Sequence, residues 1–536
     1  MAGITSTALG GIVVLAALLL YRYISHWRTN YKIALTTGFP VFYSPIAQIW
    51  KIWKMGHDPF REAGSDTFVL ATPSGNMLWS SDDTVIRGLF EQHPKVDAPV
   101  EFLKFWNVWG PTIASVQGAE WKVHRKAVTA GFGPAMNHTV WKETLSQTQK
   151  LATHWTEDHQ AIVPVVRYWT SRLALHIICN GFFGMKVEWN ADNQKSLPTG
   201  HKIALDAALP KFIENLAVFV TVPTALLSRL PVKKFRDTYE NFTEITTYLD
   251  EFRAKVLNNV EAVPAKKSKT ILESVVLSEV SEKNPLAKES VLGNIFFTLL
   301  AGHETTGGTL GFIYLLMAIY PDHQKQLQKQ LDDQLGDRSP ENWSLEKDYP
   351  ILKQGLLGAI QKEVLYFYNP ASFMMRKTLS PVTLVDSNNK AHQIPENTLT
   401  LINNAGAARN PKTWKRSKIS KERRNALSDS PALDFDPDRW LDEKDQRLAN
   451  WTAFGAGGRV CPGKEFANIE LTAAMATLFK LYSLELVVVK ENDETDDMAW
   501  KRTRDQAIRM FYDDMEANIT IGVHKDIPIR IVERVV

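Results

Sequence analysis

The chain has very little cysteine, since Cys179 and Cys461 are the only two among 536 residues. Two cysteines exclude a disulfide framework and a four-cysteine zinc module. An excess of one charge is also missing, because 62 Lys and Arg stand against 59 Asp and Glu. This balance gives no support to nucleic-acid binding driven by bulk charge. Hydrophobic residues make up 44% of the chain, which excludes a disordered or collagen-like protein. One cysteine acting alone remains possible.

A long hydrophobic run lies near the N-terminus, from Ala8 to Tyr23, and carries no charge before Arg22. With Ile4 to Ser6 it is just long enough to cross a membrane, because a span needs roughly 20 residues. A cleaved signal peptide and a buried core helix are the alternatives, but no basic residue precedes the run. Basic residues follow it, so the positive-inside rule places the rest of the chain in the cytosol. We expect a signal-anchor transmembrane helix in residues 1–24 and a connector in 25–59.

The remainder, residues 60–536, is expected to form one large domain that is mainly α with small β-sheets. Turn residues and β-branched pairs predict short strands within 70–78 and 381–401. The clearest helix is predicted from Lys288 to Tyr320, with Pro321 as its stop. It is apolar on nearly every face, so it should cross the domain interior over roughly 50 Å. Polar residues within such a helix are costly and therefore usually functional.

The two cysteines have different surroundings. Cys179 lies in an apolar helical run, where a buried inert thiol is the ordinary interpretation. Cys461 lies in FGAGGRVCPG, residues 454–463, whose glycines and proline exclude a regular helix or a central strand. An apolar-periodic helix follows directly. We therefore expect Cys461 near a helix N-terminus, where the dipole and free N–H groups favour the thiolate.

The same ten residues resemble the haem-binding signature of the cytochrome P450 family, Phe-x-x-Gly-x-Arg-x-Cys-x-Gly. Every fixed position matches: Phe454, Gly457, Arg459, Cys461 and Gly463. The resemblance implies the cytochrome P450 fold and a haem b whose iron has the Cys461 thiolate as axial ligand. In that family the thiolate pushes electron density onto the iron and favours O–O cleavage.

Four further segments are similar to motifs of the same family and follow in its order. Residues 301–306, AGHETT, look like the oxygen-activation segment of its long central helix, which implies a catalytic Glu304 and Thr305. Trp121 and Arg125 match its Trp-x-x-x-Arg, and Arg376 is similar to a second arginine that binds a haem propionate. The segment FDPDRW, residues 435–440, resembles the segment ahead of the cysteine loop.

The carboxyl group of Glu304 and the hydroxyl group of Thr305 are chemically suited to oxygen activation. A hydroxyl can hold an oxygen species while a nearby acid passes protons through water. Gly302, Gly307 and Gly308 weaken the helix locally, which would allow a kink and room for O₂. The structural alternative is that Thr305 bonds the carbonyl four residues back and that Glu304 pairs with a basic residue.

One family motif is broken. The family's Glu-x-x-Arg corresponds here to Glu363 and Tyr366, so the arginine is replaced by tyrosine. We expect Glu363 to pair with Arg439 of the FDPDRW segment, with one neutral hydrogen bond from Tyr366. An arginine makes bidentate bonds to a carboxylate and a tyrosine makes one bond, so this departure should weaken haem retention or stability. Replacing Tyr366 by Arg is expected to raise haem occupancy or the melting temperature.

Several other classes of protein compete with this interpretation. A zinc hydrolase would need a second histidine after His303-Glu304, where Gly307 stands. A dinucleotide-binding loop lacks its third glycine, because Val460 occupies that position. Within the resembling fold, a haem-thiolate peroxide isomerase or dehydratase and a non-catalytic haem-binding protein stay open. Glu304 and Thr305 together favour a monooxygenase.

The resemblance also implies surroundings for the site. A pocket lined by apolar and aromatic side chains would suit a lipophilic substrate such as a terpenoid, polyketide or fatty acid, in secondary-metabolite biosynthesis. Electrons would come from NADPH through a membrane-bound cytochrome P450 reductase, with cytochrome b5 as a further partner, at the endoplasmic reticulum membrane. Basic docking candidates are Lys122, Lys126 and Lys464. The candidate substrate contacts are Phe102, Phe105, Phe297, Ala301 and Phe373.

Overall fold

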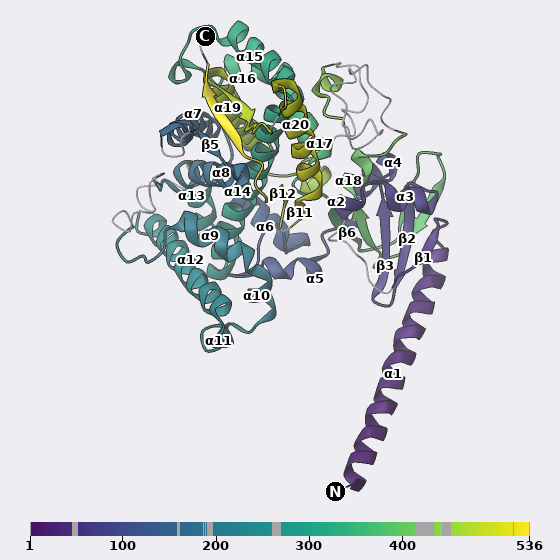
Figure 1. Cartoon of the computed structure of the whole chain (residues 1–536). Coiled ribbons are helices and arrows are strands. Elements are labelled where there is room, and N and C mark those ends of the chain that lie inside the picture. The colour runs from purple at the N-terminus through teal and green to yellow at the C-terminus, as the bar shows by residue number, and fades with distance from the viewer. Residues whose placement is uncertain are drawn as a thin grey trace. The chain divides into compact units, whose positions relative to one another are not determined.

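The computed structural model describes residues 2–44, 52–157, 161–185, 187, 189, 197–259, 270–412, 434–441, 452–491, 493–517 and 519–534, without the side chains of 2–10 and 517. Helices predominate and the sheets are small (Figure 1), as the sequence predicts. The chain divides into two compact units, which are described one at a time. Unit 1 holds Met1–Pro99, Ser372–Trp414 and Gly455–Val460, and unit 2 holds Val100–Ala371, Lys415–Phe454 and Cys461–Val536.

Unit 1 is built on a six-stranded mixed sheet with the order β1-β2-β3-β9-β6-β4. The strands predicted within 70–78 and 381–401 are confirmed, and β3 pairs in parallel with β9, with Met77 opposite Leu399. The elements of unit 1 are α1 (Ala2–Leu35), β1 (Val41–Tyr43), α2 (Ile52–Met55), α3 (Asp58–Ala63), β2 (Thr67–Thr72), β3 (Gly75–Ser80), α4 (Asp83–Glu91), β4 (Val96–Asp97), β6 (Met374–Thr378), β7 (Val382–Val385), β8 (Ala391–Ile394), β9 (Leu399–Ile402), α18 (Asn404–Ala408) and the 3₁₀ turn η10 (Gly457–Arg459).

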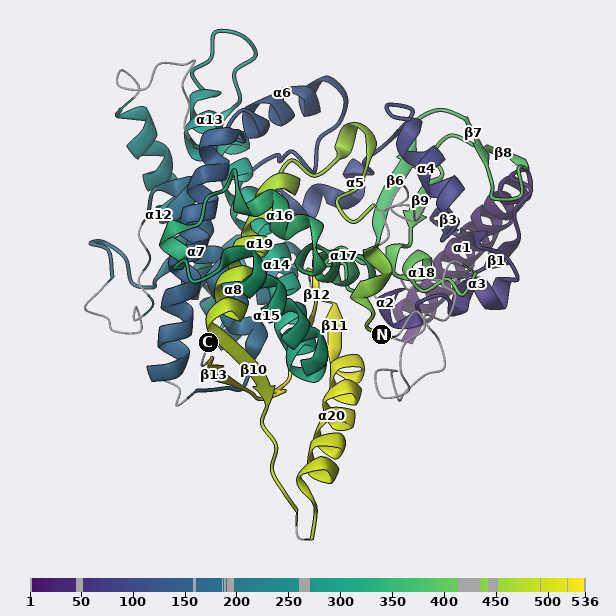
Figure 2. The same cartoon turned by 90° about the horizontal axis from the view of Figure 1, so that it is seen from above.

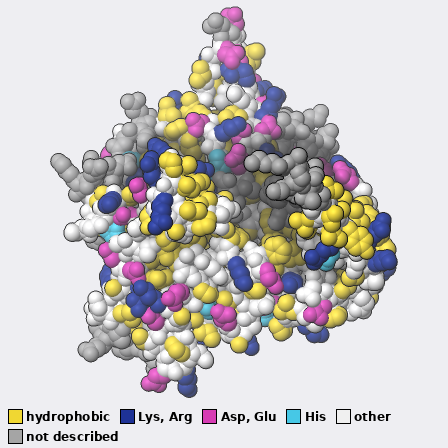
Figure 3. Space-filling model, turned by 90° about the horizontal axis from the view of Figure 1, so that it is seen from below, with side chains coloured by type: hydrophobic (Ala, Val, Ile, Leu, Met, Phe, Trp, Pro, Cys, Tyr) yellow, Lys and Arg dark blue, Asp and Glu magenta, His cyan; other side chains and the backbone are white. Residues whose placement is uncertain are grey.

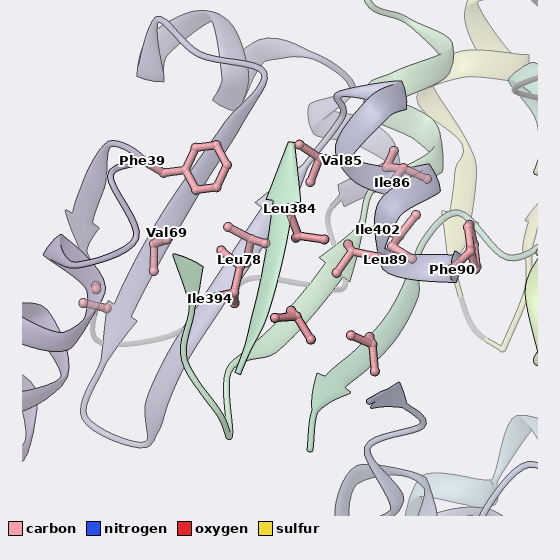
Figure 4. Packing of buried hydrophobic residues seen from close by; sticks show 14 residues of the cluster. Phe39, Val69, Leu78, Val85, Ile86, Leu89, Phe90, Leu384, Ile394 and Ile402 are labelled. Carbon is pink, nitrogen blue, oxygen red and sulfur yellow. The ribbon is translucent and has the colours of Figure 1, made fainter. Parts of the chain in front are cut away.

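The core of unit 1 lies between this sheet, the β7–β8 hairpin and α4 (Figure 4). Val85, Ile86 and Leu89 point from α4 toward Leu384 and Ile402 of the strands, and all five are buried. The spacing of the three helical residues places them on one face of the helix, so a single amphipathic helix covers this part of the sheet. Asp82 caps α4 by accepting from the backbone N–H of Thr84 and Val85.

Helix α1 has two dissimilar halves. Its C-terminal half is bonded to β2, because Trp27 Nε1 donates to the carbonyl of Ala71 at 2.8 Å and Asn30 Nδ2 donates to that of Thr72 at 2.8 Å. Large apolar side chains between Ile12 and Tyr21 are exposed. Hydrophobic side chains gather on the face of the molecule seen from below (Figure 3). Among the described residues, no helix combines the length and the hydropathy that a membrane span requires. The predicted anchor, 1–24, includes ten residues whose side chains lie outside that description.

Unit 2 contains most of the helices, packed around the central helix α14 (Lys288–Ile319). The predicted helix and its stop are confirmed, since α15 begins at Pro321. The other elements are α5 (Val100–Leu103), η2 (Lys104–Trp106), α6 (Gly118–Thr129), α7 (Pro134–Glu157), β5 (Ile162–Val163), α8 (Val166–Phe183), α9 (Leu205–Glu214), α10 (Leu216–Thr221), α11 (Thr224–Leu227), α12 (Lys233–Leu257), α13 (Ile271–Leu277), α15 (Pro321–Leu335), η5 (Pro340–Asn342), α16 (Asp348–Gln354), α17 (Leu356–Phe367), η8 (Pro437–Trp440), α19 (Lys464–Leu481), β10 (Tyr482–Leu486), α20 (Asp496–Asp513), β11 (Met515–Ala517), β12 (Ile521–Val523) and β13 (Ile529–Glu533).

Two glycines of α14, Gly302 and Gly307, lie where helix α8 packs closely against it. A Cβ on Gly302 would collide with Ile178 of α8, and a Cβ on Gly307 would lie 2.5 Å from the Cα of Ser171 in the same helix. Helix α14 runs without interruption from Lys288 to Ile319. These glycines therefore allow close approach of α8, and a kink that makes room for O₂ stays a prediction.

In the C-terminal part of unit 2, helix α20 follows strand β10 along the chain and precedes strand β11. Figure 2 shows α20 extending beside the chain that leaves β10. Its C-terminal end is fixed, because Phe511 packs against Phe312 of α14 and the hydroxyls of Tyr512 and Tyr368 are 2.6 Å apart. The β11–β12 hairpin follows directly and pairs Met515 with Val523.

Candidate functional site

The loop that carries Cys461 is closed by one hydrogen bond, in which the backbone N–H of Cys461 donates to the carbonyl of Phe454 at 2.9 Å. Gly457 within it has φ +66° and would, with a Cβ, lie 2.6 Å from the carbonyl oxygen of Phe90. Both conditions require glycine at that position. Gly463 is the N-cap of α19, so Cys461 lies just before a helix start, as predicted.

The electrostatics of Cys461 differ from the expectation. Burial raises the pKa of the Cys461 thiol, and it outweighs the backbone N–H of Gly463 and the charges of Arg125 and Lys464, which lower that pKa. The N–H group at the helix start acts in the predicted direction, but burial of the thiol outweighs it. Cys179 is fully buried and its pKa is raised by burial, which agrees with an inert thiol.

Helix α6 supplies the other candidates of unit 2 near this thiol. Trp121 is buried and Arg125 is half-buried one helical turn later, where its charge acts on Cys461. Lys122 and Lys126 are exposed on the same helix, and Lys464 is exposed at the first turn of α19.

Unit 1 carries a cluster of two guanidinium groups around one carboxylate. Arg459 Nε donates to Asp97 Oδ1 at 2.7 Å, and the Arg459 side chain is only 9% exposed. Arg376 of β6 lies within the electrostatic range of both. Burial, followed by the charge of Arg459, lowers the pKa of Arg376 to about 10, while Asp97 raises it. Among the described residues, Arg376 and Arg459 thus place two cations beside Asp97, and cations of this kind can bind a further carboxylate.

The acid and the hydroxyl of α14 both have partners within unit 2. Glu304 Oε2 lies 2.8 Å from Arg167 Nη2, and Thr305 Oγ1 donates to the carbonyl of Ala301 at 2.8 Å. Both contacts are those of the structural alternative. Burial raises the pKa of Glu304, but His303, Arg167 and Thr520 lower it more strongly, to about 2. Glu304 is thus a carboxylate at neutral pH.

The broken Glu-x-x-Arg motif is completed by a different residue. Glu363 accepts from Trp440 Nε1 at 2.6 Å and from the backbone N–H of Asp436 at 2.8 Å, and Arg439 Nε lies 3.3 Å from it. Tyr366 packs edge-on against the Trp440 ring at 5.2 Å. The indole N–H therefore bonds the carboxylate that an arginine would bind in the family's motif.

The candidate substrate contacts fall into two groups. Phe297 and Ala301 are half-buried on α14, and the Phe297 ring lies 5.8 Å from that of Trp106. Phe102 and Phe105 are 52% and 38% exposed. In unit 1, Phe373 packs against the core cluster of Phe60, Phe68 and Trp79.

Comparison with known proteins places the chain. Residues 95–508 match the cytochrome P450 family, and the chain belongs to it. A cytochrome P450 monooxygenase of Arthrobotrys oligospora is 24% identical over 94% of this chain and 95% of that protein. One of Postia placenta is 25% identical over 81% of each chain. The phomenoic acid biosynthesis cluster cytochrome P450 monooxygenase of Leptosphaeria maculans is 21% identical over 79% of this chain and 76% of its own length. The chain is accordingly an oxidoreductase of the monooxygenase type.

Family membership implies a haem-thiolate iron cofactor, and the residues present fit it. Cys461 offers a soft sulfur ligand with a backbone N–H and the charge of Arg125 directed at it. Iron bound to the sulfur would supply the thiolate stabilisation that burial opposes, since a coordinating thiol is deprotonated. Within unit 1, the guanidinium groups of Arg376 and Arg459 are of the kind that bind a propionate carboxylate.

Three residues that contact Glu363 or Glu304 could not be assigned these roles from the sequence motifs. Trp440 follows Arg439 directly, and its indole could be suspected only from the missing arginine. Arg167 lies in a largely buried helix, and an arginine there indicates a buried partner but does not say which residue it is. Thr520 stands in a short hairpin and has no distinguishing pattern.

Proposed function

We propose that the chain is a haem-thiolate monooxygenase that inserts one oxygen atom from O₂ into a lipophilic small molecule in secondary-metabolite biosynthesis. The observation that carries the proposal is the Cys461 loop, where one thiol, one closing hydrogen bond and one cation from α6 come together ahead of α19. Hydroxylation, epoxidation and multi-step oxidation all belong to this reaction class.

The residues divide the work. Cys461 would ligate the iron. Trp121 and Arg125 would bind one haem propionate. Arg376 and Arg459 would offset the negative charge of a propionate carboxylate. When bound, the haem supplies the redox centre at which O₂ is activated. Thr305 holds a hydroxyl on the same helix as Glu304, and the Thr305 proton becomes available when its bond to the Ala301 carbonyl opens. Glu304, an ionised carboxylate, accepts and returns protons in exchange with water.

The substrate class rests on apolar side chains and on relatives. Phe297 and Trp106 form an aromatic pair beside Ala301, and such surfaces bind lipophilic skeletons. The Leptosphaeria maculans relative is named for a biosynthesis cluster, which favours a secondary metabolite here as well. A polyketide or a terpenoid fits this surface.

The electron source is an NADPH-cytochrome P450 reductase with an acidic docking face, with cytochrome b5 as a second donor. Lys122 and Lys126 are exposed four residues apart on α6, which places both charges on one helical face. Lys464 is exposed at the start of the helix that follows Cys461. Charges of this kind set the association rate more than the affinity.

Membrane attachment at the endoplasmic reticulum, with the catalytic part in the cytosol, belongs to the same proposal. The exposed apolar side chains from Ile12 to Tyr21 would be costly in water, since each buried CH₂ group is worth about 0.8 kcal/mol. A membrane offers the surroundings that such a helix lacks in water.

The test of the proposed function is the absorption spectrum of the reduced, CO-bound protein. The wild type should show the thiolate-type Soret shift, and Cys461→Ala should lose it. A wild type without the shift, or an alanine variant that keeps it, contradicts the proposal. NADPH consumption with purified reductase then separates a monooxygenase from a peroxide isomerase and from a non-catalytic haem protein. Incubation with metabolite extracts, with and without NADPH, identifies the substrate.

A further inference from the structure

Arg167 is a buried arginine that the proposed mechanism does not use. It is the second residue of α8, and its side chain is 10% exposed. Its Nη2 atom lies 2.8 Å from Glu304 Oε2, so a cation from a neighbouring helix holds the acid of α14. A buried arginine that lost this partner would be an uncompensated charge, which is strongly unfavourable.

Thr520 closes a three-membered ring of contacts with these two residues. Its hydroxyl accepts from Arg167 Nη2 at 2.7 Å and donates to Glu304 Oε2 at 3.2 Å. The next carbonyl, that of Ile521, accepts from Arg167 Nη1 at 3.1 Å. The β11–β12 hairpin lies beside α14 (Figures 1 and 2), so Arg167 ties the hairpin to the central helix.

Two backbone segments lie close to the Arg167 guanidinium. A Cβ on Gly522 would lie 2.6 Å from Arg167 Cζ, and a Cβ on Gly308 would lie 2.7 Å from Arg167 Nη1. The guanidinium is thus enclosed by the backbones of β12 and α14. The hairpin itself is held, because the N–H of Ile521 donates to the carbonyl of Pro370 at 3.2 Å.

From this geometry we propose that Thr520 is a positioning residue for Glu304, and that its bridging hydroxyl fixes the direction in which the carboxylate exchanges protons. The proposal rests on the proposed function, in which Glu304 moves protons. Arg167 and Thr520 both contact Oε2 of Glu304, and His303 faces Oε1, so three contacts orient the carboxylate. The Thr520 contact is the one that comes from the hairpin, and its loss would leave Oε2 with Arg167 alone.

The charges that face Glu304 come from three elements. His303 Nε2 of α14 lies 3.5 Å from Oε1, Arg167 faces it from α8, and His524 and Glu516 lie on the hairpin side. Burial lowers the pKa of Arg167, although Glu304 acts in the opposite direction. The carboxylate stays ionised at neutral pH, so loss of the Thr520 contact would change its orientation and leave it ionised.

The experiment uses the haem-loaded enzyme with purified reductase and compares Thr520→Val, Thr520→Ser and Gly522→Ala, each with and without Glu304→Gln. Three quantities are measured: NADPH oxidation in H₂O and D₂O, H₂O₂ released per NADPH, and thermal unfolding. Thr238→Val is the matched control, because Thr238 is a buried threonine of α12 whose hydroxyl donates only to the carbonyl of Lys234 among the contacts described.

We expect Thr520→Val to slow NADPH oxidation about fivefold and to raise the solvent isotope effect, because misplaced groups commonly cost a factor of up to about 100. Thr520→Ser should restore both, and Gly522→Ala should reproduce the valine variant by displacing the guanidinium. On Glu304→Gln, Thr520→Val should have no further effect. Thr238→Val should lower stability at most and leave the isotope effect unchanged.

The contrary outcomes are equally specific. An unchanged isotope effect in Thr520→Val, or the same fivefold loss on top of Glu304→Gln, overturns the proposal and leaves Thr520 a structural residue. If the wild type consumes no NADPH, the proposed function fails. Thermal unfolding then tests only whether Thr520 and Glu304 interact. Non-additive stability changes for positions 520 and 304 then support it, and additive changes reject it.

Discussion

Glu363 belongs to the family motif that this chain breaks at Tyr366. Its carboxylate is 1% exposed and is bonded by an indole N–H, a backbone N–H and one guanidinium nitrogen. Arg439 also donates to the carbonyls of Asp434 and Asp436 and lies over the Phe367 ring at 4.9 Å. The carboxylate therefore connects α17 to the 435–440 segment without the usual arginine.

The first prediction concerns Trp440, which supplies the shortest of these bonds. Trp440→Phe should lower the free energy of unfolding by about 1–3 kcal/mol, since a buried carboxylate loses a donor. Tyr366→Arg should add nothing in the wild type, which revises the expectation from the sequence, because both carboxylate oxygens already have donors. In the Trp440→Phe background it should recover stability. Chemical denaturation of the four proteins measures this, and an equal gain in both backgrounds contradicts it.

The second prediction follows from the pKa of Glu363. Burial raises that pKa to about 7, against the lowering by Arg439, Asp436 N–H and Trp440. The folded state thus binds this proton more tightly than the unfolded state does. Its contribution to stability is complete below the unfolded pKa of 4.5 and is lost as the pH rises through 7.

Glu363→Gln cannot ionise, so it should escape this loss. Its melting temperature relative to the wild type should rise between pH 5 and pH 8, by an amount equivalent to about 2.5 kcal/mol. Any constant cost of the amide, which offers one acceptor to two donors, cancels in the comparison across pH. Melting curves of the two proteins that stay parallel over this range would refute the assigned pKa.

At the scale of elements, the contact of α14 with α8 rests on glycine. Gly307 brings α14 against the backbone of Ser171, and Gly308 leaves the space that the Arg167 guanidinium occupies. The glycines that the sequence suggests as weak points of helix α14 are thus positions where α8 packs closely against it. Close packing of this kind tolerates little added volume.

The third prediction tests this packing. Gly307→Ala should cost about 1–3 kcal/mol of stability, because its Cβ would lie 2.5 Å from Ser171 Cα and the helices must separate. Gly181→Ala in α8 is the control, since its Cβ would lie 3.8 Å from Thr139 Cγ2. The control should be neutral or stabilising by up to about 1 kcal/mol. Thermal unfolding separates the two, and equal effects would argue against helix contact as the cause.

The elements also show what a sequence can and cannot predict. The Cys461 loop and the ends of α14 follow from contiguous residues, so both could be predicted from local patterns. The partners of Glu304 lie at positions 167 and 520, and only the folded chain brings them together. The exchange of an arginine for Trp440 depends on the same kind of distant contact.

At the scale of the whole molecule, α1 joins a buried attachment to an exposed apolar segment. The fourth prediction is that removal of residues 1–24 leaves the melting temperature unchanged and moves the protein from the membrane pellet to the supernatant. Removal of residues 1–35 should also destabilise unit 1, because Trp27 and Asn30 bond the backbone of β2. Fractionation and thermal unfolding of both truncations check this. A shorter truncation that stays in the pellet would place the attachment elsewhere.

Unit 1 is assembled from three separate stretches of the chain, and this has a consequence for synthesis. The edge of β3 at Met77 pairs with β9 at Leu399, which is synthesised much later, and the last stretch of the unit ends at Val460. On the ribosome, β2 and β3 emerge long before their neighbour, so an unpaired strand edge is exposed during most of translation. Pairing across such sequence distances is slow. The nascent chain should therefore depend on chaperones at this edge, and its yield should respond to translation rate more than to the stability of the finished protein.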